Sequence, residues 1–133
     1  MNTFKESVAY IVEKTKNLLI DVDEGQIQRV CEIFLGAERI FLYGAGRSGL
    51  VAKAFAIRLV HLGFQTYVIG ETITPPVREN DLVVVISGSG ETIPSVMTAE
   101  IAKKMGAKLI VITCLLYTSD AADDGESVDI GGR

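Results

Sequence analysis

The sequence has few cysteine and histidine residues, and it lacks tryptophan and any long apolar run. It contains no tryptophan, two cysteines (Cys31 and Cys114) and one histidine, His61. Two cysteines so far apart exclude a disulfide framework and a CxxC-type metal pair. We expect Cys31, which lies in a helical pattern, to be a buried apolar residue. No apolar run approaches the ~20 residues that a membrane-spanning helix needs.

The charge and the first residues of the chain argue against further classes of protein. The formal net charge is −4, but basic and acidic residues balance up to Thr113. Lysine and arginine form no continuous stripe, which gives little support to a nucleic-acid partner. The first residues contain no basic segment followed by an apolar core, so we expect no secretory signal and a cytoplasmic protein without membrane contact.

The last twenty residues differ from the rest of the chain. The acidic excess comes entirely from this segment, and the hydrophobic periodicity is lost there. The string from Cys114 to Asp124 resembles translated sequencing-adapter DNA, and a natural acidic C-terminus is the alternative. We therefore predict one domain over residues 1–113, with a fold that is incomplete at its C-terminus, and a non-native tail over 114–133.

Hydrophobic spacing and glycine positions predict the secondary structure. Apolar residues at helical spacing predict helices over residues 3–20, 27–35, 48–62 and 92–105. Short apolar runs predict strands over 39–43, 65–69, 82–86 and 109–113. In the third helix, we expect Leu50, Ala54, Ile57 and His61 to form the buried stripe. Strands that alternate with helices predict a three-layer α/β fold with a parallel sheet, preceded by two helices.

A glycine-rich loop, Gly44-Ala45-Gly46-Arg47-Ser48-Gly49, follows the first predicted strand and opens a helix. Its GxGxxG spacing, with Glu71 near the end of the next strand, matches the dinucleotide-binding fingerprint. Arg47 and Ser48 place polar groups where dinucleotide-binding loops often have none. In addition, Pro75-Pro76 makes the region around Glu71 irregular. This loop alone therefore leaves a nucleotide or another anion as alternatives.

A second loop, Ser87-Gly88-Ser89-Gly90-Glu91-Thr92, follows the third predicted strand. A helix cap needs one hydroxyl group, which Thr92 alone could supply, but this loop carries three. Backbone N–H groups, hydroxyls and a helix N-terminus together suit an anion. Because loops after parallel strands lie at the same sheet edge, the two loops predict a phosphate site.

These segments together resemble a known family. The two loops, the segment from Arg58 to Phe64 and Gly70-Glu71 are similar to the sugar isomerase (SIS) domain, a Rossmann-like phosphosugar-binding module. Within it, residues 1–113 most resemble the 6-phospho-3-hexuloisomerase family. That resemblance implies isomerisation of 3-hexulose 6-phosphate and fructose 6-phosphate through an enediolate. It also implies a phosphosugar ligand, no cofactor or metal, and a homo-oligomer, typically a tetramer.

The resemblance also assigns roles to residues. It implies phosphate contacts from Gly46, Ser48, Ser87, Gly88, Ser89 and Thr92. It implies a catalytic role for His61, for which a core histidine is the alternative interpretation. Arg47 and Glu71 are candidates for the sugar pocket, with solvent exposure as the alternative for both.

The catalytic base is the part of the site that we do not find in the sequence. The resemblance implies a glutamate beyond Thr113, so we expect this chain to hold half a site and to be inactive or nearly so. Two other functions stay open. One is a non-catalytic SIS sensor that binds a phosphosugar, and the other is an isomerase of arabinose 5-phosphate or sedoheptulose 7-phosphate.

Overall fold

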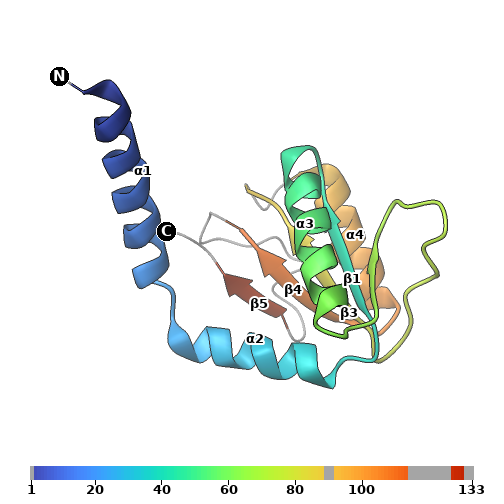
Figure 1. Ribbon diagram of the computed structural model, residues 1–133. Coiled ribbons are helices and arrows are strands. Elements are labelled where there is room, and N and C mark those ends of the chain that lie inside the picture. The colour runs from blue at the N-terminus through green and yellow to red at the C-terminus, as the bar shows by residue number, and fades with distance from the viewer. Residues whose placement is uncertain (1, 89–91, 114–126, 131–133) are drawn as a thin grey trace.

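The computed structural model describes residues 2–88, 92–113 and 127–130 (Figure 1). Its elements are α1 (Thr3–Ile20), α2 (Glu24–Gly36), β1 (Ile40–Gly44), α3 (Arg47–His61), β2 (Thr66–Val68), β3 (Leu82–Ile86), α4 (Ile93–Lys104), β4 (Lys108–Ile112) and β5 (Ser127–Ile130). After two leading helices, α3 connects β1 to β2 and α4 connects β3 to β4, whereas β2 is followed by β3 without a helix between them. The helices and strands predicted up to Thr113 are confirmed, with shifts of a few residues at their ends.

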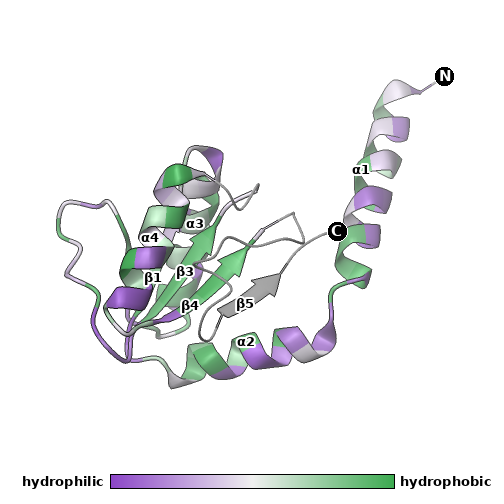
Figure 2. Cartoon of the chain, turned by 180° about the vertical axis from the view of Figure 1, so that it is seen from behind, coloured by the Kyte–Doolittle hydropathy of each residue, from purple (hydrophilic) through white to green (hydrophobic). Residues whose placement is uncertain are grey.

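The strands form one parallel sheet in the order β2-β1-β3-β4-β5. In register, β1 pairs Leu42 with Val68 of β2 and Gly44 with Ile86 of β3. The carboxyl ends of β1 and β3 are therefore neighbours. Strand β3 is apolar at every position, as expected for a strand that is covered on both faces, and Figure 2 shows β3 and most of β4 in green.

Alternate strand residues build a separate core on each face of the sheet. On one face, Ile40 and Leu42 pack with Phe34 of α2 and with α3. On the other face, Phe41 and Val83 pack with α4. The molecule thus has three layers, with α2 and α3 on one side of the sheet and α4 on the other. This confirms the predicted three-layer α/β fold.

The buried stripe of α3 differs from the prediction. Ala52, Ala56 and Leu59 face the sheet, whereas Leu50 and Ile57 are 67% and 59% exposed and His61 is exposed as well. The physical reason is a close approach between α3 and β1. A Cβ atom on Gly44 would lie 2.4 Å from the carbonyl oxygen of Ser48. At that separation only small side chains, those of Ala52 and Ala56, fit between the sheet and the part of the helix nearer the loop, so Leu50 and Ile57 turn outward. Leu59 packs in the same core farther from the loop.

The two leading helices contribute unequally to the core. Helix α1 has no buried residue and projects from the α/β body (Figure 1). Helix α2 buries Ile33 and Phe34. Cys31 is exposed, so the prediction that it is buried is wrong. Ile33 and Phe34 define the inward face of α2, and Cys31 lies off that face.

The segment after Thr113 contributes one described strand, which the sequence did not predict. Strand β5 pairs in parallel with β4, with Ser127 opposite Leu109. That residues 114–133 form a non-native tail stays a prediction. Among the residues that the structure describes, no helix combines the length and hydrophobicity needed to cross a membrane.

Candidate phosphosugar site

The two glycine-rich loops lie side by side at the carboxyl edge of the sheet. The first follows Gly44 at the end of β1, and the second follows Ile86, which is paired with Gly44. The backbone N–H of Ser87 donates to the carbonyl of Ile112 at 2.9 Å, so the second loop begins against β4. In an open parallel sheet, ligands bind outside this edge.

Three glycines shape the first loop. Gly46 has φ 59° and ψ −127°, a conformation that residues with a Cβ atom strongly disfavour. Gly44 and Gly49 touch each other, because a Cβ on Gly49 would lie 2.6 Å from the carbonyl oxygen of Gly44. This tight turn brings Ser48, half-buried in the first turn of α3, to the sheet edge. Arg47 is exposed.

The second loop begins with a buried serine. Ser87 is 3% exposed, and the carbonyl of the next residue, Gly88, accepts from the Thr113 hydroxyl at 3.3 Å. Thr92 is the residue that precedes α4, yet its side chain makes no capping hydrogen bond. Helix capping therefore does not account for Thr92. Ser89 lies outside the described residues.

A surface pocket of about 280 Å³ opens beside the first loop. One wall is the loop itself, and the opposite wall is the end of β2 and the residues that follow it. Lys53 and Glu71 are its charged groups, with Nζ and Oε1 3.7 Å apart. Glu71, expected near a sugar pocket, thus lies on a pocket wall. Lys53 was not predicted, although it stands two turns into the helix that the loop opens.

A second pocket, of about 330 Å³, lies on the other side of Glu71. It is formed between α4 and the segment from Ile69 to Val77, and its walls are mostly apolar. The two pockets share Ile69, Gly70 and Glu71. The short segment after β2 therefore separates a polar pocket on the loop side from an apolar one on the α4 side.

His61 lies away from both loops. It is the last residue of α3 and is exposed. Since an α-helix rises 1.5 Å per residue, His61 is on the order of 20 Å from the first loop. The structure thus brings Gly46, Ser48, Ser87, Gly88 and Thr92 to one sheet edge, and it places His61 at the opposite edge.

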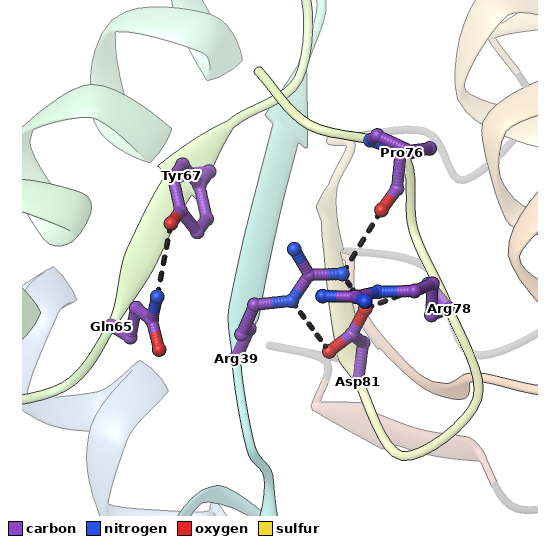
Figure 3. Close-up of polar contacts among 6 residues, drawn as sticks. All are labelled: Arg39, Gln65, Tyr67, Pro76, Arg78 and Asp81. Atoms are coloured by element: carbon purple, nitrogen blue, oxygen red, sulfur yellow. Dashed lines mark hydrogen bonds and ion pairs between the residues drawn. The ribbon is translucent and has the colours of Figure 1, made fainter. Parts of the chain in front are cut away.

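A buried ion pair holds the far end of the segment that carries Glu71 (Figure 3). Arg39 donates through Nε to Asp81 Oδ1 at 3.0 Å and through Nη2 to Oδ2 at 2.6 Å. Nη2 also donates to the Pro76 carbonyl at 3.0 Å, and the Arg78 backbone N–H donates to Asp81 Oδ2 at 2.7 Å. These contacts fix the connection between β2 and β3 to the amino edge of the sheet.

The surroundings of the ion pair shift both pKa values toward the charged forms. Burial acts to raise the pKa of Asp81, but hydrogen bonds from Arg39 and the Arg78 backbone, with the charges of both arginines, outweigh it and lower the pKa. The pKa of Arg39 is raised, chiefly by its hydrogen bond to Asp81. Sequence reasoning missed this pair. The signal in the sequence was a pair of opposite charges, Arg39 and Asp81, each directly before an apolar strand.

A parallel α/β domain with two hydroxyl-bearing glycine loops at one sheet edge defines a class of anion-binding proteins. Comparison with known proteins gives the family: the model of the SIS domain matches residues 33–124. That match covers more than half of the chain, and the chain belongs to the SIS domain family.

Two curated relatives and one solved structure show how similar the chain is to individual proteins. An uncharacterized protein of Aeropyrum pernix is 48% identical over 84% of this chain. A 3-hexulose-6-phosphate isomerase of Methylomonas aminofaciens is 39% identical over 100% of the chain and 72% of its own length. A hypothetical protein of Methanococcus jannaschii, whose crystal structure infers 3-hexulose-6-phosphate isomerase function, has a TM-score of 0.79 at 32% identity. That match covers 92% of this chain and 72% of the other.

The chain is shorter than these relatives. It spans 52% of the Aeropyrum pernix protein, and 56% and 57% of relatives from Archaeoglobus fulgidus and Methanothermobacter thermautotrophicus. The resemblance inferred from the sequence, to the SIS family and to hexulose phosphate isomerases, is confirmed.

Proposed function

We propose that the protein is a phosphosugar isomerase that interconverts 3-hexulose 6-phosphate and fructose 6-phosphate. The observation that carries this proposal is the pairing of Gly44 with Ile86, which sets two hydroxyl-bearing glycine loops next to each other. The relatives named 3-hexulose-6-phosphate isomerase support the particular substrate. The proposal includes the sugar phosphate as ligand and a homo-oligomer as the working form.

The phosphate is held by neutral donors. Ser48 and Thr92 stand at the starts of α3 and α4, where backbone N–H groups and the helix dipole favour an anion. Ser87 and Ser89 add hydroxyls from the second loop. A phosphate carries several acceptor oxygens, so a ring of such donors binds it without a cationic side chain.

The reaction moves a carbonyl between neighbouring carbons. A base removes the proton from C2 of 3-hexulose 6-phosphate, the C2–C3 enediolate forms, and the proton returns to C3 while the carbonyl forms at C2. No electrons leave the substrate, so the overall change is an isomerisation. General bases for such steps are commonly carboxylates or histidines within hydrogen-bond reach of the proton. We assign the base to a glutamate that this chain does not supply among its described residues.

His61 is proposed to handle the hydroxyl proton or to assist ring opening. It lies at the end of α3 opposite to Ser48 and is exposed. A histidine in that place cannot reach the phosphate loops of its own chain. Its catalytic role therefore requires a second copy of the chain that presents His61 to the site.

Two measurements test the proposal. Calorimetric titration of this chain with fructose 6-phosphate should show binding, and Ser87→Ala with Ser89→Ala should abolish most of it. Turnover of 3-hexulose 6-phosphate should be absent or very low in this chain and present in the full-length gene product. Robust turnover by this chain would refute the missing base.

A panel of aldose and ketose phosphates separates the alternatives. Full-length protein that isomerises arabinose 5-phosphate or sedoheptulose 7-phosphate in preference would contradict the proposed substrate. Binding of a sugar phosphate by the full-length protein without turnover of any of them would indicate a sensor and contradict an enzyme.

A further inference from the structure

The pocket beside the first loop is lined by Lys53, which has no role in the proposed function. We propose that Lys53 and Glu71 form the subsite for the hydroxyl groups of the sugar, and that Lys53 distinguishes a phosphosugar from bare phosphate. This inference rests on the proposed function, because it takes the phosphate to lie on the two serine-bearing loops.

The position of the pocket fits this role. Strand β1 lies between β2 and β3, so the first loop is central, the second loop is on its β3 side and the pocket is on its β2 side. Neighbouring strands are about 4.8 Å apart, which places the pocket about 10 Å from the second loop. A hexose phosphate anchored on the loops can extend along the sheet edge toward the pocket.

The glycines of the first loop leave this path open. Gly44, Gly46 and Gly49 line the pocket on the loop side, and they present backbone without side chains. Ser48 stands between Gly46 and Gly49 in the chain, at the start of the helix that also carries Lys53. One turn of backbone thus connects the proposed phosphate anchor with the pocket wall.

The chemistry of the charged pair favours hydroxyl groups over phosphate. The ammonium group of Lys53 only donates hydrogen bonds, and the carboxylate of Glu71 only accepts them. A sugar hydroxyl does both, so it can bridge the two groups. A phosphate would meet the repulsion of Glu71 as well as the attraction of Lys53, because the pair is neutral overall.

The pair retains capacity for a ligand. Its separation of 3.7 Å is too long for a direct hydrogen bond. The two side chains are 57% and 52% exposed, so both are accessible from solvent. An exposed ion pair of this kind contributes little to stability, so a ligand can reach both groups at a small cost.

The backbone holds Glu71 in place. Its N–H donates to the Val68 carbonyl at 3.3 Å, and its own carbonyl accepts from the Thr74 N–H at 3.2 Å. The Thr74 hydroxyl donates to Val68 at 2.7 Å. Lys53 is fixed in the middle of α3. The subsite is therefore built on a helix and a hydrogen-bonded turn, which limits the ordering that binding requires.

The test uses two probes, fructose 6-phosphate and inorganic phosphate, titrated into the whole chain by calorimetry. For Lys53→Met we expect fructose 6-phosphate to bind about tenfold more weakly, as for the loss of a hydrogen bond to a charged group. Phosphate should bind within about twofold of the unchanged chain, given that a factor of two is a small difference in free energy. Glu71→Gln should show the same selective loss.

Lys104→Met is the matched control. Lys104 is an exposed lysine at the last turn of α4, and its replacement should change neither affinity. Because exposed ion pairs contribute little to stability, Lys53→Met should unfold at nearly the same temperature as the unchanged chain. Should it not fold, Glu71→Gln and Lys53→Gln carry the same comparison.

The outcomes separate this inference from the proposed function. Equal losses for both probes would mean that Lys53 holds the phosphate, which overturns the subsite. Unchanged affinities in Lys53→Met and Glu71→Gln would overturn it as well. If the unchanged chain binds neither probe, the proposed phosphate anchor itself is wrong.

Discussion

Arg39 and Asp81 are 42 residues apart in the chain and are joined by two hydrogen bonds, of 3.0 and 2.6 Å. They precede β1 and β3, whose carboxyl ends carry the two glycine loops. The guanidinium group also lies 5.0 Å from the centre of the Phe41 ring. The pair therefore ties the amino edge of the sheet to the segment that leads back to Glu71.

Removal of the Asp81 charge should destabilise the fold. Asp81→Asn leaves the guanidinium group of Arg39 buried without a counter-charge, which costs about 3–5 kcal/mol. Chemical denaturation should show this loss in the free energy of unfolding. Asp21→Asn, at an exposed helix end, is the control and should change stability by less than about 0.5 kcal/mol. Similar small effects for both variants would contradict a structural role for the pair.

Acid should weaken the fold through the same carboxylate. The pKa of Asp81 is lower in the folded protein than in the unfolded chain, where it is about 3.9. The stability that this shift provides is fully present above the unfolded pKa and is lost as pH falls through the folded value. We expect NMR titration of the side-chain carboxyl carbon of Asp81 to give a midpoint below the ordinary aspartate value of about 3.9. A midpoint at or above that value would contradict the expected direction.

Gly44 should not tolerate a side chain. Gly44→Ala places a Cβ atom 2.4 Å from the Ser48 carbonyl oxygen, and backbone cannot yield as a flexible side chain can. Overpacking of this kind costs about 1–3 kcal/mol, and it should also displace Ser48 and weaken phosphate binding. Gly36→Ala has nothing within 4 Å of the new atom and is the control. Equal thermal unfolding temperatures for both variants would argue against the close approach of α3 and β1.

Two serines near the second loop should behave in opposite ways. Ser87→Ala should weaken binding of inorganic phosphate about tenfold, as for a lost charge-assisted hydrogen bond. Ser95, in the first turn of α4, is 3% exposed, and its hydroxyl has no hydrogen-bond partner among the residues that the structure describes. Ser95→Ala should therefore leave phosphate binding intact and keep or slightly raise stability. Calorimetry and thermal unfolding of the two variants measure both effects. Equal losses of phosphate affinity would contradict the assignment of Ser87.

The sequence was sufficient to locate strands β1 to β4 and the glycine loops that follow β1 and β3. Runs such as Leu82–Ile86 are apolar at every position, which is typical of a strand covered on both faces, and the glycine spacing marks where those strands end. These signals are local, so a single sequence carries them.

The parts that sequence reasoning missed depend on how elements approach each other. Ala52 and Ala56 face the sheet because Gly44 and Gly49 let α3 come close, and periodicity alone favoured the larger residues Leu50 and Ile57. Lys53 belongs to a pocket wall only because the end of β2 lies opposite. The partner of Arg39 was unpredictable for the same reason, since strand order decides that β1 and β3 are neighbours.

Helix α3 runs without a break from the first loop at its start to His61 at its end. A reaction that uses both ends must draw them from different chains. Its rate per chain would then fall when dilution brings the protein concentration below the dissociation constant of the assembly. In the full-length gene product, mixing a variant that lacks His61 with one that lacks Ser87 would restore part of the activity that each variant has lost.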